Sequence, residues 1–337
     1  MTARLLSYPL HMTFDLIAIG ESLRDVFYLL DEASVSCSLH KDRCLLCLDF
    51  SAKIPVRHIV KVPAAGNSAN AAVGASRLGL RTSLVTWIGD DRAGHHITEA
   101  LTDDRVNLRF LQVDRKHPTS EATILVFKGE RTQLVNFQPR AYRLPKLPST
   151  TCIYYSAVGA SHDRLDRMLA QELKRHPETR FVFQPGTTHI LGGLEKLKPL
   201  LAQSFLFILN KDEAHHLLGD GSRPIRHLLE SLYAHGAQTV IITDGGNGAD
   251  AYDGTAHWHM PVFPVTPIEP TGAGDSFATG VTVALLTRNG LPHALRCGTA
   301  NSWSVIQEIG PQKGLLTKVR MNRVLKKFKK IQPQRQL

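Results

Sequence analysis

The stretch Glu269–Gly280, EPTGAGDSFATG, places a carboxylate directly behind two glycines and at the start of an apolar segment. Gly272 and Gly274 open backbone conformations that other residues rarely adopt, and they remove side chains that would block an anion. The apolar run predicts a helix that begins near Ala273, and the first N–H groups of a helix lack internal partners and carry the positive end of its dipole. Gly272, Ala273 and Gly274 therefore predict a backbone anion hole for a phosphoryl group, and Asp275 is the predicted general base beside it.

A helix cap is the simpler explanation of an acid at this position, because Asp275 or Ser276 could provide one. A cap accounts for one acid but not for the two glycines that flank Ala273, so we favour the general base. The reaction that suits this arrangement is phosphoryl transfer, in which a substrate hydroxyl loses its proton as it attacks the γ-phosphorus of a nucleoside triphosphate. Backbone N–H groups would stabilise the phosphoryl oxygens during that step.

Other nucleotide and metal motifs are absent from the sequence. It contains no G-x-x-x-x-G-K-[ST] P-loop, so the helicase-like DEAH at Asp212–His215 is interpreted as coincidence. Cys44 and Cys47 have the spacing of a zinc pair, but no second pair follows, and thiols are the favoured interpretation. Five cysteines in a chain of 337 residues do not suggest a disulfide framework, which favours a reducing, cytoplasmic setting.

Predicted strands alternate with predicted helices through most of the chain. The strand-like segments are apolar without strict alternation, which is typical of parallel strands that are covered on both faces. The expected strands are 14–20, 82–89, 152–159, 180–186, 205–210 and 239–245, and the expected helices are 68–79, 94–104, 163–176, 211–219 and 224–236. This pattern predicts an α/β fold with a mostly parallel central sheet between two helical layers.

Two segments, 26–63 and 116–140, interrupt this alternation and predict a small β lid. Within the second segment, residues 121–137 predict a hairpin with its turn at Lys128–Glu130. The segments 1–25, 64–115 and 141–317 form the predicted main domain, which is discontinuous in sequence.

Much of the net charge of +10 lies at the C-terminus, where residues 318–337 hold eight basic residues and no acid. We interpret this segment as a solvated basic tail or a last helix, and contact with nucleic acid or an anionic surface is the less favoured alternative. The sequence has no run of about 18 apolar residues, so no membrane span is expected.

Four motifs together resemble the PfkB-type (ribokinase-like) carbohydrate kinase family. PTGAGDSFATG is similar to the C-terminal signature of that family, and AAGNSANAAVGASRLGL at 64–80, followed by WIGDDRAG at 87–94, is similar to its N-terminal signature. NKDEAHHLLG at 210–219 resembles the Asn-x-x-Glu motif, and ITDGGNGADAY at 242–252 resembles the strand and turn that touch the nucleotide phosphates. The resemblance implies a ribokinase-like, Rossmann-type three-layer sandwich with a β lid, and an ATP-dependent kinase that uses Mg²⁺.

On the acceptor side, the resemblance implies that Asp25 binds substrate hydroxyls and that Gly66, Asn67 and Asn70 belong to the sugar-binding motif. Asp275 corresponds to the general base of the family. Taken alone, Asp25 could be a loop acid, and the two asparagines could cap a helix. In relatives the lid covers the sugar and often pairs two subunits, which implies a homodimer through the lid as one option.

On the nucleotide side, the resemblance implies that Asn210 and Glu213 organise water and Mg²⁺ around the triphosphate, with Glu213 acting through water. Thr243 and Gly245 would border the phosphates, and Asn301 lies in a helix that walls the adenine in relatives. Glu213 also has a purely structural explanation, because an acid is favourable in the first turn of any helix.

Three departures from the family pattern qualify these expectations. Ala65–Gly66 replaces a pair of glycines, and Asn67 stands where many sugar kinases carry a lysine. Glu269–Pro270 replaces the Asp-Thr pair that helps ribokinases bind a monovalent cation, and proline fixes φ and lacks an N–H. K⁺ activation is therefore not favoured.

The favoured acceptor is a sugar or sugar derivative. Arg140 is the candidate cation for a phosphate on the acceptor, and an exposed surface arginine is the alternative. FQPGT at 183–187 resembles a stretch of some nucleoside kinases, so a nucleoside kinase is the alternative within the family. A non-catalytic sensor of nucleotide and sugar is the alternative from another class, and the retention of Asp275 with both glycines argues against it.

Overall fold

The computed structural model describes residues 13–38, 44–219, 221 and 223–336. Its centre is a ten-stranded sheet, in which seven neighbouring strands are parallel and the last three, β14 to β16, are antiparallel. The spatial order is β16 (Gln334–Gln336), β15 (His257–Met260), β14 (Ala249–Tyr252), β13 (Val240–Thr243), β12 (Leu206–Asn210), β11 (Arg180–Phe183), β10 (Cys152–Tyr155), β1 (Leu16–Ile19), β6 (Thr82–Gly89) and β7 (Leu111–Asp114).

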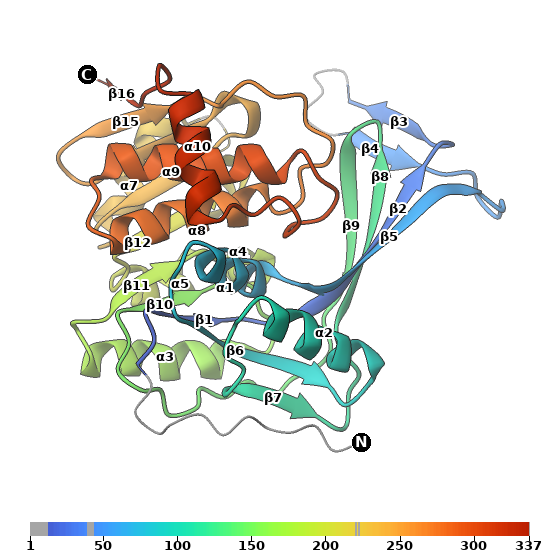
Figure 1. The fold of residues 1–337 in the computed structure, drawn as a ribbon, viewed down its shortest axis with the longest axis horizontal. Helices are drawn as coiled ribbons and strands as arrows, with labels where there is room; N and C mark the ends of the chain where they lie inside the picture. Colours follow the sequence, from blue (N-terminus) through green and yellow to red (C-terminus); the bar gives the residue numbers. More distant parts are fainter. Residues whose placement is uncertain (1–12, 39–43, 220, 222, 337) are drawn as a thin grey trace.

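Helices cover both faces of this sheet, so the predicted three-layer α/β fold is confirmed (Figure 1). Because the central strands are buried on both sides, their side chains feed two separate apolar cores. The helices of one layer are α1 (Asn67–Arg77), α2 (Arg92–Asp103), α8 (Ala273–Leu286), α9 (Leu291–Val305) and α10 (Lys318–Lys327). Those of the other layer are α3 (Asp163–Arg175), α4 (Thr187–Gly192), α5 (Leu194–Leu201), α6 (Lys211–Leu218) and α7 (Ile225–Ala234).

A second sheet projects to one side of this body and is built from the segments predicted to form the lid, a name kept for it below (Figure 1). Its strands lie in the order β5 (Val56–Ala65), β2 (Leu23–Leu30), β8 (Glu121–Phe127) and β9 (Glu130–Asn136). Lys128 and Gly129 both have positive φ, at 51° and 81°, as a two-residue hairpin turn requires. A small hairpin of β3 (Ser34–Cys37) and β4 (Cys44–Cys47) extends the lid further.

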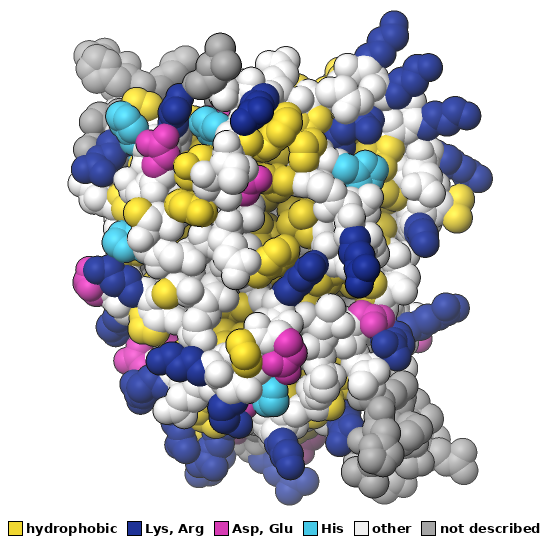
Figure 2. Space-filling model, turned by 90° about the vertical axis from the view of Figure 1, so that its left-hand side faces the viewer, with side chains coloured by type: hydrophobic (Ala, Val, Ile, Leu, Met, Phe, Trp, Pro, Cys, Tyr) yellow, Lys and Arg dark blue, Asp and Glu magenta, His cyan; other side chains and the backbone are white. Residues whose placement is uncertain are grey.

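The basic C-terminal segment, expected to be a solvated tail or a last helix, forms α10 and packs on the main body. Met321 and Val324 of α10 are buried, and Phe328 stacks on Phe263 with ring centroids 4.5 Å apart. Apolar residues spaced by three and four positions are the signature of a packed helix, and this spacing distinguishes the helix from a solvated tail. On the face turned away from the lid, Lys and Arg side chains lie along the edges, with several at one upper edge, and a few lie over the middle (Figure 2).

The expectation that all the cysteines are thiols is also corrected. Cys37 and Cys44 form a disulfide, because the β3–β4 register places them directly opposite each other with Cα atoms 4.0 Å apart. Cys47, Cys152 and Cys297 are free thiols. The bridge also removes Cys44 from the zinc pair that the sequence suggested. Among the described residues, no helix has the length and apolar character needed to cross a membrane.

Candidate active site

Asp275 lies in the first turn of α8, where the chain turns from a loop into an apolar helix. Gly272 precedes the helix in the left-handed region, with φ of 78°, and a Cβ on it would overlap Pro311. No other residue fits that position without strain. The result is a carboxylate that is only 8% exposed and that sits at the positive end of a buried helix.

Three side-chain amides hold the Asp275 carboxylate. Asn67 Nδ2 and Gln184 Nε2 donate to Oδ1 at 2.9 and 3.1 Å, and Asn70 Nδ2 donates to Oδ2 at 2.7 Å. Gly66 makes this approach possible, because it caps α1 with φ of 102° and a Cβ there would overlap the carbonyl oxygen of Glu21. The two signature motifs, far apart in sequence, thus meet at one carboxylate.

These contacts set the basicity of Asp275. Burial raises its pKa, because the charged form is poorly solvated there. Hydrogen bonds from Asn70 and Gln184, the charge of Arg131 and the hydrogen bond from Asn67 act in the opposite direction. An ionised carboxylate whose pKa lies above its ordinary value is suited to accept a proton from an alcohol near neutral pH.

Asp25 lies nearby on β2 and is 6% exposed. Burial, together with the negative charges of Asp275 and Glu269, raises the pKa of Asp25 to about 8. Asp25 therefore carries a proton at neutral pH for much of the time, and a protonated carboxyl can both donate and accept hydrogen bonds. A largely protonated Asp25 beside the amide-bound Asp275 carboxylate fits a site that binds and activates hydroxyl groups.

The backbone at the start of α8 differs in detail from the predicted anion hole. The Ala273 N–H donates to the carbonyl oxygen of Pro270 at 3.1 Å, so it already has a partner. Within the described part of the chain, the N–H groups of Gly272, Gly274 and Asp275 have no hydrogen-bond acceptor, and Gly274 is exposed. Gly272, Gly274 and Asp275 are thus the amides that an anion can reach without breaking a protein contact.

The residues expected on the nucleotide side gather at the carboxyl ends of β12 and β13. Asn210 and Glu213 form a reciprocal cap at the start of α6, with each side chain accepting from the other's backbone N–H at 2.8 Å. Burial raises the pKa of Glu213 to about 7. Thr243 pairs with Asn210 in the sheet register, and Gly245 follows with φ of 50° and open space around its Cα.

Comparison with known proteins places this geometry in a family. The family model of the pfkB family carbohydrate kinases matches residues 30–318. The chain belongs to this family. It is an ATP-dependent kinase that transfers a phosphoryl group to a hydroxyl of a sugar or sugar derivative.

Two curated relatives and two solved structures illustrate the relationship. The chain is 29% identical to fructoselysine 6-kinase of Shigella flexneri over 254 residues, which are 73% of this chain and 90% of that protein. It is 24% identical to 5-dehydro-2-deoxygluconokinase of Lacticaseibacillus casei over 275 residues, or 74% and 82% of the two chains. The nucleoside kinase of Methanocaldococcus jannaschii shares the fold with a TM-score of 0.75 at 20% identity, covering 93% of this chain and 98% of that one. Arabidopsis thaliana ribokinase, complexed with ribose and ATP, gives 0.73 at 18% identity, covering 94% and 99%.

Asn301, a predicted site residue of this kinase, already uses its side chain in hydrogen bonds within the protein. Asn301 is fully buried, and its amide bridges the carbonyl oxygen of Ser276 at 2.8 Å and the N–H of Leu316 at 3.0 Å. It therefore joins α8 and α9 to the following loop, and its side chain does not face an open adenine site.

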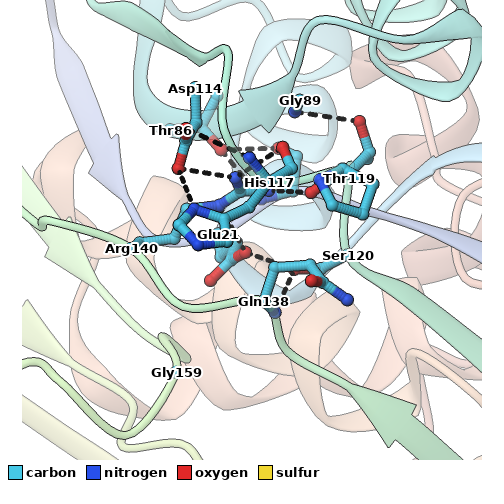
Figure 3. Close-up of polar contacts among 12 residues, drawn as sticks. Glu21, Thr86, Gly89, Asp114, His117, Thr119, Ser120, Gln138, Arg140 and Gly159 are labelled. Atoms are coloured by element: carbon cyan, nitrogen blue, oxygen red, sulfur yellow. Dashed lines mark hydrogen bonds and ion pairs between the residues drawn. The ribbon is translucent and has the colours of Figure 1, made fainter.

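Arg140 is not placed as a ligand for the acceptor, which corrects the expectation from the sequence. Its side chain is only 1% exposed. The guanidinium donates to Glu21 at 3.4 Å, to Asp114 at 3.1 Å, to the carbonyl oxygen of His117 at 3.2 Å and to that of Pro118 (Figure 3). The sequence could not show that Glu21 and Asp114 would surround this arginine.

Glu21 is the centre of that buried network, which lies where the chain crosses between the main body and the lid. The residue joins β1 to β2, and its carboxylate accepts hydrogen bonds from Ser120, just before β8, and from Tyr142, after β9. Burial raises the pKa of Glu21, and these donors and Arg140 oppose that rise. The Glu21 carboxylate thereby contacts three segments that run between the main body and the lid, at Ser120, Arg140 and Tyr142; Figure 3 shows the contacts with Ser120 and Arg140.

Two residues that the sequence analysis missed contribute to the site of the kinase. Gln184 follows β11 within FQPGT, and its position at the carboxyl end of a parallel strand was the signal that could have identified it. Arg131 lies on β9 opposite Val126, so it shares the inner face of the lid with Val126 and with Ile124. It is exposed and makes no ion pair with a described residue, and its charge acts on Asp275.

One buried group among the described residues has the spacing of a metal site but not its chemistry. Atoms of His162, Asp166 and His189 lie within 4.8 Å of one another. The Gly186 N–H donates to His189 Nδ1 at 3.1 Å, so the proton of the neutral ring lies on Nε2, which faces the Tyr155 hydroxyl at 3.1 Å. A protonated ring nitrogen cannot bind a metal, and the hydrogen bonds account for the cluster.

Proposed function

We propose that Asp275 is the general base of this carbohydrate kinase. The observation that carries the proposal is the carboxylate held by three amides, directly beside N–H groups that have no acceptor among the described residues. The acceptor oxygen attacks the γ-phosphorus of ATP, its proton passes to Asp275, and the bond from the γ-phosphorus to the bridging oxygen breaks to release ADP. The N–H groups of Gly272 and Gly274 stabilise the charge on the phosphoryl oxygens, and the Ala273 N–H joins them only if its bond to Pro270 opens.

Asp25 is proposed to bind the acceptor. Its carboxyl is protonated for much of the time at neutral pH, so it donates one hydrogen bond to a substrate hydroxyl and accepts another. Asn67 and Asn70 hold Asp275, and their remaining amide atoms complete the sugar-binding motif together with Gly66. This division separates hydroxyl binding at Asp25 from proton transfer at Asp275.

The triphosphate is proposed to lie along the carboxyl ends of β12 and β13, bordered by Thr243 and Gly245. Oxygen ligands suit Mg²⁺, which keeps several of its waters when it binds protein. Asn210 and Glu213 fit a role through such waters, because their side-chain oxygens already accept backbone hydrogen bonds in the α6 cap. Bound Mg²⁺ would neutralise charge on the phosphates. Asn301 is proposed to support the adenine side through its helix and not through its own side chain.

K⁺ activation is not part of the proposal. Both carboxylate oxygens of Glu269 accept hydrogen bonds within the protein, Oε1 from Thr271 and Oε2 from the Gly310 N–H at 3.4 Å. These hydrogen bonds use part of the acceptor capacity that Glu269 would otherwise offer to a cation.

The acceptor is proposed to be a sugar derivative that carries an acidic group, because Arg131 presents an exposed cation on the inner face of the lid. Lid strands also expose Ile59 on β5 and Leu134 on β9, which supports a homodimer through the lid. Sedimentation of the wild type and of Leu134→Lys tests the dimer, and two identical monomeric profiles would contradict it.

A turnover experiment tests the kinase assignment to Asp275 against the alternative of a sensor. ADP release from Mg-ATP is measured with a panel of sugars, acidic sugar derivatives and nucleosides, for the wild type and for Asp275→Asn. We expect the substitution to lower kcat by about 10²- to 10⁴-fold with little change in the KM for ATP, which is the usual effect of losing a general base. Near-normal turnover by Asp275→Asn would refute the role. Thermal shifts with ligands but turnover by neither protein would favour a sensor, and preference for nucleosides would favour the nucleoside kinase.

A further inference from the structure

A cavity of about 730 Å³ lies outside the residues assigned to ATP and acceptor. It is formed by the start of α6, the start of α7, the turn after β13 and the strands β14 to β16. Asp250, His257 and His259 lie on the face of β14 and β15 that points away from α8 and α9, because Ala251 and Trp258 between them pack in the core on the other side. The cavity and Asp275 are therefore reached from different sides of the sheet.

The lining of this cavity is rich in nitrogen donors. Three cations, three histidines and two carboxylates face it, namely Lys211, Arg223, Arg226, His215, His257, His259, Asp244 and Asp250. Each carboxylate already has a hydrogen-bond partner, because Lys211 Nζ lies 3.0 Å from Asp244 and His259 Nδ1 lies 3.1 Å from Asp250. Arg226 also contacts Glu230 at 3.0 Å, but that pair is exposed and contributes little in water.

Helix α7 adds a backbone feature to the same wall. Its N-cap is Pro224, which has no side-chain acceptor for the first N–H groups of the helix. These groups and the helix dipole favour an anion at this end. Arg223 and Arg226 stand on either side of Pro224 and Ile225, so their charges and the helix N-terminus act on the same space.

His257 provides the independent indication of a ligand. Its side chain is only 10% exposed, yet neither ring nitrogen has a hydrogen-bond partner among the described residues. The nearest acceptor in an ion-pair contact is Asp250, whose Oδ1 lies 3.9 Å from Nε2, beyond hydrogen-bond reach. Buried polar groups in folded proteins are nearly always paired, so an unpaired imidazole that lines a cavity marks a place where a ligand donates or accepts.

We infer that this cavity is a second ligand site, which binds a small phosphorylated sugar. The phosphate lies against Arg223, Arg226 and the start of α7, where these cations and the positive end of the helix dipole meet. The sugar hydroxyls lie against β14 and β15, where Asp250 accepts hydrogen bonds and His257 both donates and accepts. Neither half of the ligand requires a residue of the kinase site, so the inference stands apart from the role proposed for Asp275.

The test uses isothermal titration of the full-length protein with ribose 5-phosphate, in the presence of saturating Mg-ADP. Arg223→Gln and His257→Gln each remove one contact from the cavity, and His216→Gln on the exposed face of α6 is the matched control. Asp25→Ala serves as a second control that weakens the acceptor site. We expect about a tenfold or greater increase in Kd for Arg223→Gln and His257→Gln, and no change for the two controls.

The opposite pattern would overturn the inference. A Kd that is unchanged in Arg223→Gln and His257→Gln but raised in Asp25→Ala would place ribose 5-phosphate in the acceptor site. No binding to the wild type at millimolar concentration would also reject the site. Arg223 is exposed and distant from the cores, so Arg223→Gln reports on the cavity even if the buried substitution His257→Gln prevents folding. Binding of ribose with the same Kd as ribose 5-phosphate would reject the phosphate contact.

Discussion

Asn70 Nδ2 lies 2.7 Å from Asp275 Oδ2, although 205 residues separate them in sequence. The contact joins the first turn of α1 to the first turn of α8. Gln312 in turn donates to Asn70 Oδ1 at 2.9 Å, which fixes the orientation of the asparagine amide. The base proposed for phosphoryl transfer is therefore held by residues whose own positions are set by neighbours.

Gln184 is expected to tune the pKa of Asp275. Its amide donates to Oδ1 and lowers that pKa, so Gln184→Ala should raise it. The acid limb of the pH profile of kcat should then move to higher pH, by about one unit. Tyr154→Phe is the matched control, because the tyrosine hydroxyl donates to the other end of the same amide and its loss leaves the Gln184 N–H in place. Identical pH profiles for wild type and Gln184→Ala would contradict this role.

Asp25 makes the stability of the protein depend on pH. Its pKa in the folded state is about 8, well above that of an exposed aspartate, so the native state retains a proton that the unfolded state releases. The free energy of unfolding should consequently fall as pH rises from about 4 to about 8, since the native state binds more protons throughout that range. Asp25→Asn removes this dependence and should stabilise the protein most at the upper end of the range. Urea unfolding at pH 5 and pH 8 measures both effects. An equal change at the two pH values would show that Asp25 is ionised in the native state.

Arg131 should select among acceptors. Arg131→Gln is expected to raise the KM for acidic sugar derivatives by about tenfold or more, because a charged hydrogen-bonding partner is lost, while the KM for ATP stays within about twofold. Arg57→Gln is the control, since Arg57 is also an exposed lid arginine but pairs with Asp31. If Arg131→Gln raised the KM for ATP and left the KM for every acceptor unchanged, Arg131 would be assigned to the ATP phosphates instead.

The C-terminal segment should act on stability and not on polyanion binding. Truncation after Thr317 removes the buried side chains of α10 and the Phe328 ring, and we expect Tm to fall by about 10 °C or more. A Lys329→Ala/Lys330→Ala variant removes charge but keeps those apolar contacts, so its Tm should match the wild type. If only the double variant lost stability, the charges would be the important feature.

The sequence predicted the elements that carry strong local signals. The strands and helices of the central sheet follow from apolar runs and their period, and Gly272 follows from the backbone conformation that the site requires. Gly66 was assigned only through the family resemblance. Asn67 and Asn70 were placed near Asp275 only through the family resemblance, since no local pattern links residues 205 positions apart.

Contacts between distant side chains were not predictable in this way. Arg140 and Arg131 look alike in sequence, and only the fold shows that one is enclosed by Glu21 and Asp114 while the other faces the site from the lid. Likewise, Ala273 was expected to offer its N–H to an anion, and the turn to Pro270 that occupies it depends on loop geometry. The Cys37–Cys44 bridge depends on the β3–β4 register, which no cysteine count reveals.

The network around Glu21 restricts how the lid can move. The buried Glu21 carboxylate accepts hydrogen bonds from Ser120, Arg140 and Tyr142, where the chain runs between the main body and the lid. A rotation of the whole lid about these residues would break those hydrogen bonds. A movement of the lid that keeps these hydrogen bonds would have to come from flexing of β2 and β8 beyond this anchor, where the strands leave the body. The tip of the lid would sweep widely while its root stays still.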